Sequence, residues 1–199
     1  MALRRPEPGT FEKLLTEVHV RALDMVRLTR FPATEPYWSK GVHRFDDPEP
    51  SRPNGFGCTY AAESLDVAFA ESIIHECSRF VLGHYEVPLA ELTGRHTVRF
   101  HRPRRPTLVL ADLRGDALKR LGLNNDLCAT DDYTVPQLWA QAIHDADPKW
   151  DGIRSVSRQK NDAMAYALFE RSRLRMYHSE PFAGSALHDL CDKFMVVAI

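Results

Sequence analysis

The pattern of apolar and polar residues along the chain predicts strands and helices in an irregular order. Alternation predicts a strand at residues 23–31, the run TLVLADL predicts a strand at 107–113, and an apolar stripe at helical spacing predicts a helix capped by Thr134. Further predictions are a helix at 10–18, a strand near 85–87, a helix at 115–123, a strand at 153–162, a helix or strand within 164–178, a helix at 185–194 and a strand at 195–199. Because strands and helices mix without a regular β-α-β order, the sequence predicts an α+β fold, a compact mixed sheet with surrounding helices.

The stretch at residues 58–76 joins a strand to an apolar helix that carries one carboxylate. Tyr60 lies in the alternating strand, Ser64 can cap the helix, and Asp66 places negative charge near the positive end of the helix dipole. The helical neighbours of Glu71 are mostly apolar, so burial of its unpaired carboxylate would be costly. Two interpretations stay open: Glu71 pairs with an arginine at the rim of the apolar stripe, or it is a functional charge in a site.

Two arginines lie in positions that suit an anion-binding site. Arg27 falls on the strand predicted at 23–31, where an inward-facing arginine needs an anion, although a place on the solvent face is about as common. Arg44 lies in the segment GVHRFDDP, inside an irregular loop at residues 32–57 that holds five prolines and three glycines. Loops of this length within a compact domain are usually functional or disordered. The simpler interpretation of Arg44 is a turn with a surface ion pair.

Composition places the chain among globular proteins. Its 199 residues are 44% hydrophobic and carry a formal net charge of −1, which fits a single domain over residues 1–199 with a loose N-terminal arm at 1–9. Near-neutral charge gives no general basis for direct nucleic-acid binding. The four cysteines form no CxxC pair, the histidines form no HExxH motif, and no signal peptide or apolar span stands out. We therefore expect reduced thiols, a cytoplasmic location, no metal site and no membrane contact.

A basic run and two serines add to the candidate chemistry. The run at residues 95–105 fits a solvated sheet edge better than a nucleic-acid patch, because no aromatic series accompanies it; an acidic partner surface is a third option. Ser155 and Ser157 share one face of the strand predicted at 153–162. The motifs GxGxxG, GxxxxGKS/T and GxSxG do not occur in the sequence. The arginines can clamp phosphates, the tyrosine can stack on a flat ring, and the carboxylate can stabilise charge on a sugar carbon, a set that suits a dinucleotide with a cationic base.

Four segments within residues 25–160 resemble the RES domain family, toxins of bacterial toxin–antitoxin systems named for conserved Arg, Glu and Ser. The segments are MVRLTR, HRFDDP, TYAAESLDVAFAES and DGIRSVSRQ, in the family's order and approximate spacing, and YAAESLDVAFAE is the most specific. By position, the family's residues match Arg27, Arg44, Tyr60, Glu71 and Ser157, with Ser155 a competitor for the serine. The chain departs from the Gly-Gly-Arg-Trp-Asn often seen in the family, which is Val-His-Arg-Phe-Asp at residues 42–46.

The resemblance implies a fold similar to ADP-ribosyltransferases and cleavage of the nicotinamide–ribose bond of NAD, by hydrolysis or with inorganic phosphate as co-substrate. Glu71, Arg27 and Ser157 would then be catalytic, while Arg27 and Arg44 bind the diphosphate, Tyr60 packs on the nicotinamide or its ribose, and Ser157 binds the ribose or orients Glu71. No cofactor beyond NAD as substrate is expected. The resemblance also implies an Xre-type helix-turn-helix antitoxin as partner, with a homodimer within the complex. The alternatives are mono-ADP-ribosylation of a protein, a non-catalytic regulatory module with the same fold and, with less support from the charge, RNA cleavage.

Overall fold

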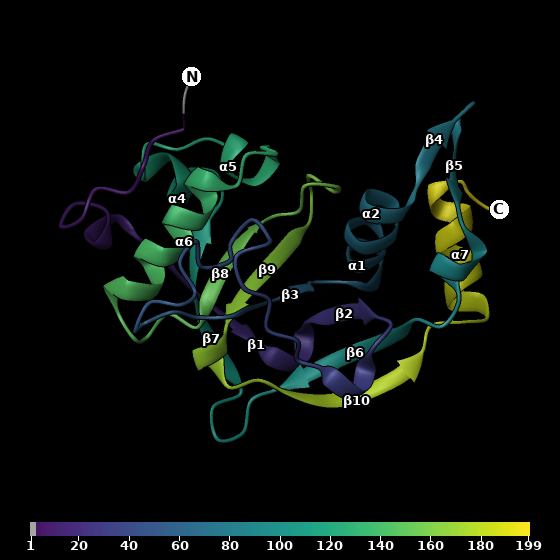
Figure 1. The fold of residues 1–199 in the computed structure, drawn as a ribbon, viewed down its shortest axis with the longest axis horizontal. Helices are drawn as coiled ribbons and strands as arrows, with labels where there is room; N and C mark the ends of the chain where they lie inside the picture. The colour runs from purple at the N-terminus through teal and green to yellow at the C-terminus, as the bar shows by residue number, and fades with distance from the viewer. Residues whose placement is uncertain (1–2) are drawn as a thin grey trace.

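An eight-stranded mixed sheet runs through the protein, whose computed structural model describes residues 3–199 (Figure 1). In spatial order its strands are β1 (Glu17–Arg21), β7 (Thr107–Leu113), β8 (Gly152–Val156), β9 (Met164–Phe169), β3 (Cys58–Ala62), β2 (Val26–Thr29), β6 (His96–His101) and β10 (Arg175–Pro181). The parallel pair of this sheet is β7 with β8. The connection between these two strands contains α4 (Gly115–Arg120), α5 (Asp126–Ala129) and α6 (Thr134–Ala146), as a parallel pair requires a long crossover.

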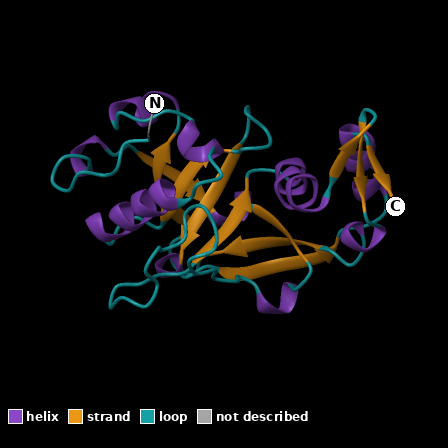
Figure 2. Cartoon of the chain, turned by 45° about the horizontal axis from the view of Figure 1, so that its top comes forward, coloured by secondary structure: helices purple, strands orange, loops and turns teal. Residues whose placement is uncertain are grey.

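A second sheet has three strands, in the order β11 (Val196–Ala198), β5 (His84–Val87) and β4 (Arg79–Val81). Figures 1 and 2 place it with α7 (Ser185–Phe194) at the same end of the molecule as the C-terminus, and the short helix α3 (Leu89–Leu92) follows β5. Phe69, the last residue of α1 (Leu65–Phe69), stacks on Phe194 with ring centroids 5.7 Å apart. This contact anchors the helix that leads to Glu71 against α7.

Helix α6 packs on the large sheet through an apolar face. Trp139 and Ile143 are buried in one cluster with Ile153 of β8 and Phe169 of β9. Full burial of such side chains contributes about 1.5–3 kcal/mol each. At 13 residues α6 is the longest helix of the described chain. None of the helices within residues 3–199 has the length and apolar character needed to cross a membrane.

The predicted elements agree with the structure in most of the chain, and most exceptions lie near the N-terminus. The strand predicted at 153–162 is another exception, because β8 ends at Val156 and the chain then turns toward β9. The strand at 107–113 and the helices from Thr134 and at 185–194 are confirmed. The helix predicted at 10–18 is wrong, because a 3-10 turn at Glu12–Leu14 is followed by β1, which pairs with β7 over five residue pairs. Pairing with a buried strand overrides the local helical spacing here. The strand predicted at 23–31 is also shorter, since a 3-10 turn at Ala22–Asp24 precedes β2.

The predicted loose arm at residues 1–9 is attached to the body over its described part, and residues 1–2 lie outside the described residues. The indole N–H of Trp139 donates to the carbonyl oxygen of Arg4 at 2.8 Å, and Leu3 packs against the cluster beneath α6. The two partners are 135 positions apart in the chain. Local sequence patterns therefore gave no sign of the attachment.

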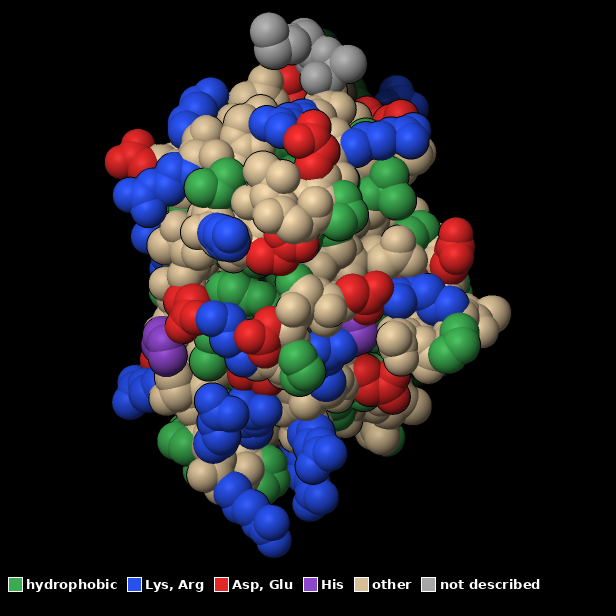
Figure 3. All heavy atoms as spheres, turned by 90° about the vertical axis from the view of Figure 1, so that its left-hand side faces the viewer, with side chains coloured by type: hydrophobic (Ala, Val, Ile, Leu, Met, Phe, Trp, Pro, Cys, Tyr) green, Lys and Arg blue, Asp and Glu red, His purple; other side chains and the backbone are tan. Residues whose placement is uncertain are grey.

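The basic run at residues 95–105 does not form a solvated sheet edge. Strand β6 lies between β2 and β10, one strand inside the edge. Arg95 is buried and donates to Glu91 at 2.9 Å, and Arg102 pairs with the buried Asp151 at 2.8 Å. The other arginines of the run are exposed, and Figure 3 shows Lys and Arg side chains gathered at the lower end of the molecule, where the loop between β6 and β7 lies in Figure 1. The run is thus divided between internal ion pairs and the surface.

Candidate functional site

A pocket opens where strands β2 and β3 separate. These neighbours share a single residue pair, Val26 with Ala62, whereas β3 pairs with β9 over five. Beyond that pair, Nη1 of Arg27 donates to the carbonyl oxygen of Tyr60 at 2.8 Å. A side chain thus satisfies a backbone acceptor that an adjacent strand would otherwise satisfy. Residues of both strands line a pocket of about 480 Å³. This volume lies within the range of roughly 300–1,000 Å³ that is typical of small-molecule sites.

The helix that forms one wall of this pocket widens at Glu71. After α1 the chain passes through a π-helical turn, Ala70–Ile74, into α2 (His75–Cys77). The N–H of His75 donates to the carbonyl of Ala70, five positions back instead of the four of an α-helix. Such π turns are rare in proteins, and those that occur are often found at functional sites. The sequence predicts the helix, but its apolar spacing gives no sign of the wider turn.

Glu71 is held by a serine, not by the arginine that one interpretation of the sequence required. Oγ of Ser157 donates to Oε1 of Glu71 at 2.5 Å, and the N–H of Gln159 reaches the same oxygen at 3.3 Å. Oγ of Ser157 also accepts the N–H groups of Gln159 and Lys160 at 3.2 and 3.1 Å, which leaves the hydroxyl proton for Glu71. Within residues 3–199 no protein donor bonds the second oxygen, Oε2. One carboxylate oxygen is therefore fixed, and the other is open to a ligand.

Tyr60 fixes the loop at residues 42–46. Its hydroxyl donates to Oδ1 of Asp46 at 2.9 Å and accepts the N–H of Phe45 at 3.0 Å. Asp46 is fully buried and also accepts hydrogen bonds from the hydroxyl of Ser39 and from two backbone N–H groups of the loop. Burial raises the pKa of the Tyr60 hydroxyl well above its usual value, so the group stays protonated and donates. The sequence showed Asp46 as part of a polar turn and missed this buried network.

Arg27 is oriented by a carboxylate of its own chain. Its Nε donates to Oε1 of Glu35 at 2.9 Å, and the Glu35 side chain is only 1% exposed. Together with the bond to the Tyr60 carbonyl, this ion pair holds the guanidinium at the pocket wall. The anion that an arginine on an inner strand requires is thus the Glu35 carboxylate of the same chain. The guanidinium keeps further N–H groups that can bind a ligand.

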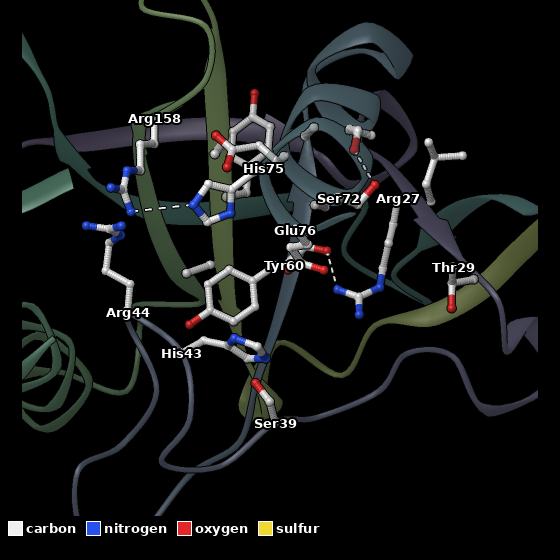
Figure 4. A pocket seen from close by; sticks show the side chains of 18 of the residues that line it. Arg27, Thr29, Ser39, His43, Arg44, Tyr60, Ser72, His75, Glu76 and Arg158 are labelled. Carbon is white, nitrogen blue, oxygen red and sulfur yellow. Dashed lines mark hydrogen bonds between the residues drawn. The ribbon is translucent and has the colours of Figure 1, made fainter. Parts of the chain in front are cut away.

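Arg44 lies on the other side of Tyr60 from Arg27 (Figure 4). Its Nη1 donates to the carbonyl oxygen of Thr130 at 2.7 Å, and its guanidinium lies over the ring of Tyr133, 4.9 Å from the centroid. No carboxylate of residues 3–199 forms an ion pair with Arg44, so the surface ion pair of the simpler interpretation is absent from the described chain. The positive charge of Arg44 therefore has no direct counter-charge in this part of the pocket.

The structure brings most of the predicted site residues to one pocket. Its lining includes Arg27, Arg44, Tyr60, Glu71 and Ser155. Ser157, just beyond the end of β8, is buried and contacts Glu71 directly. The two serines therefore differ in environment: Ser155 faces the pocket from the strand, and Ser157 supports the carboxylate.

Sequence reasoning missed two basic residues that also line the pocket, Arg158 and His75. Arg158 directly follows the predicted serine, and His75 was visible as a neighbour of Glu71 on the helix face. Their positions next to predicted site residues were the only sign in the sequence that they belong to the pocket. The same positions are also compatible with ordinary side chains on a solvated surface. Within residues 3–199, no three His, Cys, Asp or Glu side chains are grouped in a way that could hold a metal ion.

Comparison with known proteins places these features in a family. The family model described as the RES domain matches residues 20–185, which is most of the chain. The MbcT toxin in the crystal structure of the M. tuberculosis MbcT-MbcA toxin-antitoxin complex has a similar fold, with a TM-score of 0.59 and 15% sequence identity over 92% of this chain and 97% of that chain. A search among curated proteins finds no match. The large mixed sheet with surrounding helices confirms the predicted α+β class. On the match over residues 20–185, the chain belongs to the RES domain family.

Proposed function

We propose that this RES-domain protein is a toxin that cleaves the nicotinamide–ribose bond of NAD. The observation that carries the proposal is the arrangement of Glu71, whose Oε1 is held by Ser157 while Oε2 has no protein donor within the described chain. A carboxylate fixed in this way can stabilise positive charge that develops on a ribose carbon. The match of Glu71 to the family's glutamate in the sequence supports the same role.

The charges around the pocket suit the diphosphate of a dinucleotide. Arg44 has no ion-pair partner in the described chain, and Arg27 keeps N–H groups beyond those that bond Glu35 and Tyr60. Planar guanidinium groups bind phosphate oxygens with two parallel hydrogen bonds. The Tyr60 hydroxyl is engaged with Asp46, so its ring is the part available to pack on the nicotinamide or its ribose.

In the proposed reaction, the bond between ribose C1′ and the nicotinamide nitrogen breaks, and its electron pair returns to the pyridinium ring. Nicotinamide then leaves as a neutral molecule without needing a proton. Glu71 offsets the charge on the oxocarbenium-like ribose, and Ser157 keeps the carboxylate oriented. An acceptor next forms a bond to C1′ and releases a proton where it carried one. Water gives ADP-ribose, inorganic phosphate gives its phosphate ester, and a protein side chain gives an ADP-ribosylated protein.

The same proposal includes an antitoxin, of the Xre helix-turn-helix type, that covers the pocket. The protein of similar fold comes from a complex described as toxin-antitoxin. Two aromatic side chains that line the pocket here, Phe31 and Tyr37, are 69% and 56% exposed. Burial of exposed aromatic side chains is a common source of binding energy at protein interfaces. A partner that covers the pocket would bury both residues and exclude NAD.

Loss of NAD in a preparation free of any partner tests the proposal. The protein is incubated with NAD alone, with added inorganic phosphate or with cell lysate, and the products are identified by mass spectrometry. Free ADP-ribose identifies water as the acceptor, a phosphate ester identifies phosphate, and a labelled protein identifies an ADP-ribosyltransferase. No loss of NAD under any of these conditions contradicts the proposal and favours a non-catalytic binding module. RNA cleavage by the same preparation would instead favour a nuclease.

A further inference from the structure

A group of basic side chains faces one short loop at the edge of the pocket. Nη1 of Arg158 donates to Oδ1 of Asp131 at 2.7 Å and lies 3.5 Å from Nε2 of His75. Arg44 donates to the carbonyl of the preceding residue, Thr130, at 2.7 Å. Figure 4 shows Arg44, Arg158 and His75 on the same side of Tyr60, and both arginines bond to neighbouring residues of this loop, Thr130 and Asp131. All three side chains line the pocket.

Asp131 is the carboxylate on which these positive groups act. The hydrogen bond from Arg158 lowers the pKa of Asp131, and the charges of Arg44 and His75 lower it further. The Asp131 side chain is nevertheless 86% exposed, whereas that of Arg158 is 25% exposed. An ion pair with so exposed a partner is weak, because water solvates the carboxylate well in either state. A stronger anion can therefore displace Asp131 at small cost.

We propose that Arg158, together with Arg44 and His75, forms a subsite for a phosphate group, and that the Asp131 carboxylate occupies this subsite in the free protein. The subsite rests on the proposed function, to which it adds Arg158 as a third phosphate-binding arginine, beside Arg27 and Arg44, and an internal competitor for the substrate. Guanidinium groups bind phosphate more strongly than a single carboxylate, because phosphate offers more oxygen acceptors and more charge. The phosphate group has two sources, the diphosphate of a dinucleotide or free inorganic phosphate.

Calorimetric titration tests the subsite without relying on NAD cleavage. ADP-ribose and inorganic phosphate are each titrated into the wild type, Asp131→Asn, Arg158→Gln and the control Asp132→Asn. The control removes the same charge from the adjacent exposed residue, which accepts the Thr134 N–H and has no bond to the basic group. Loss of an exposed ion pair corresponds to about a two- to fivefold change in affinity, so Asp131→Asn should bind more tightly by that factor. Arg158→Gln should bind roughly tenfold more weakly, and Asp132→Asn should match the wild type.

The titrations also distinguish the source of the phosphate. If the expected changes in affinity among the variants occur with ADP-ribose alone, the subsite binds a nucleotide diphosphate. If they occur with inorganic phosphate, the subsite binds free phosphate. Either result supports the subsite. If the Asp131→Asn variant binds both anions with wild-type affinity, the proposed role of Asp131 as a competitor is wrong. This result holds even if the Arg158→Gln variant fails to fold. A protein that binds ADP-ribose in the expected pattern but leaves NAD intact would refute the proposed function and keep the subsite.

Discussion

Replacement of Ser157 by alanine should remove the support that fixes Glu71. The variant loses the donor that lies 2.5 Å from Oε1 of Glu71 and the acceptor for the N–H groups of Gln159 and Lys160. The N–H of Gln159 keeps a second acceptor, because Oε1 of Glu71 lies 3.3 Å away. The N–H of Lys160 has no other acceptor among the described residues. The substitution therefore removes one charged hydrogen bond and leaves one backbone donor unsatisfied.

These losses set the expected magnitude. A hydrogen bond to a charged group contributes about 1.5–3 kcal/mol, and a buried donor without an acceptor costs about 1–3 kcal/mol. Water can reach part of this site, since Glu71 itself is only half-buried. We therefore expect Ser157→Ala to lower the free energy of unfolding by about 2–4 kcal/mol. A carboxylate that drifts by an ångström can lose up to about a hundredfold in rate, so kcat for NAD should fall between about tenfold and a hundredfold.

Ser155→Ala is the matched control, since Ser155 is also buried, lies two positions earlier and lines the same pocket without bonding Glu71. Urea unfolding measures the free energy of each variant, and initial rates of NAD loss give kcat and KM. The control should lose about 1 kcal/mol or less and keep kcat within a fewfold of the wild type. Wild-type stability and kcat in Ser157→Ala, or a larger loss in Ser155→Ala, would refute the reasoning.

Three further predictions concern the stability of the folded protein. Tyr60→Phe should lower the free energy of unfolding by about 1–3 kcal/mol, because the buried Asp46 loses a donor and the loop loses an acceptor; an unchanged urea midpoint would contradict this. Burial lowers the pKa of His144 below its usual 6.5, so the unfolded chain takes up a proton first as the pH falls. Stability should thus be full above about pH 6.5 and decline below it, and His144→Gln should flatten this decline in urea titrations at pH 7.5 and pH 5.5. Gly152→Ala should lower the free energy of unfolding by at least about 1–3 kcal/mol, because the added Cβ would clash with the backbone carbonyl oxygen of Ala167; a wild-type melting temperature would argue against so close an approach of β8 and β9.

Local sequence patterns predicted those elements of the fold in which burial of apolar side chains alone determines the pattern. The strand at 107–113 is apolar on both faces and lies inside the sheet, and α6 has an apolar stripe that packs on β8 and β9. The N-terminal helix was wrong because the apolar residues at its end serve a strand pair with a distant partner. Alternation and helical spacing are hard to separate in so short a segment.

The candidate site residues were proposed from residue type and family resemblance, but neither source predicts their hydrogen-bond partners. Glu71 and Ser157 are 86 positions apart, so no local pattern predicts that one holds the other. Asp46 had the sequence signature of a turn, yet it is fully buried and binds Tyr60. Such networks depend on how the loop at residues 32–57 closes against β3, and a single sequence does not encode that closure in any periodic pattern.

The central claim is that the carboxylate of Glu71 acts on NAD, and its most direct test is a comparison of kcat for Glu71→Gln with that of the wild type in a partner-free preparation. Glutamine keeps the size of the side chain and an acceptor oxygen for Ser157 but removes the negative charge. Glu63→Gln, an exposed substitution in the segment just before the same helix, is the control for net charge. The account predicts a fall of about a hundredfold or more for Glu71→Gln and an unchanged rate for Glu63→Gln. A rate for Glu71→Gln within a fewfold of the wild type would contradict the account.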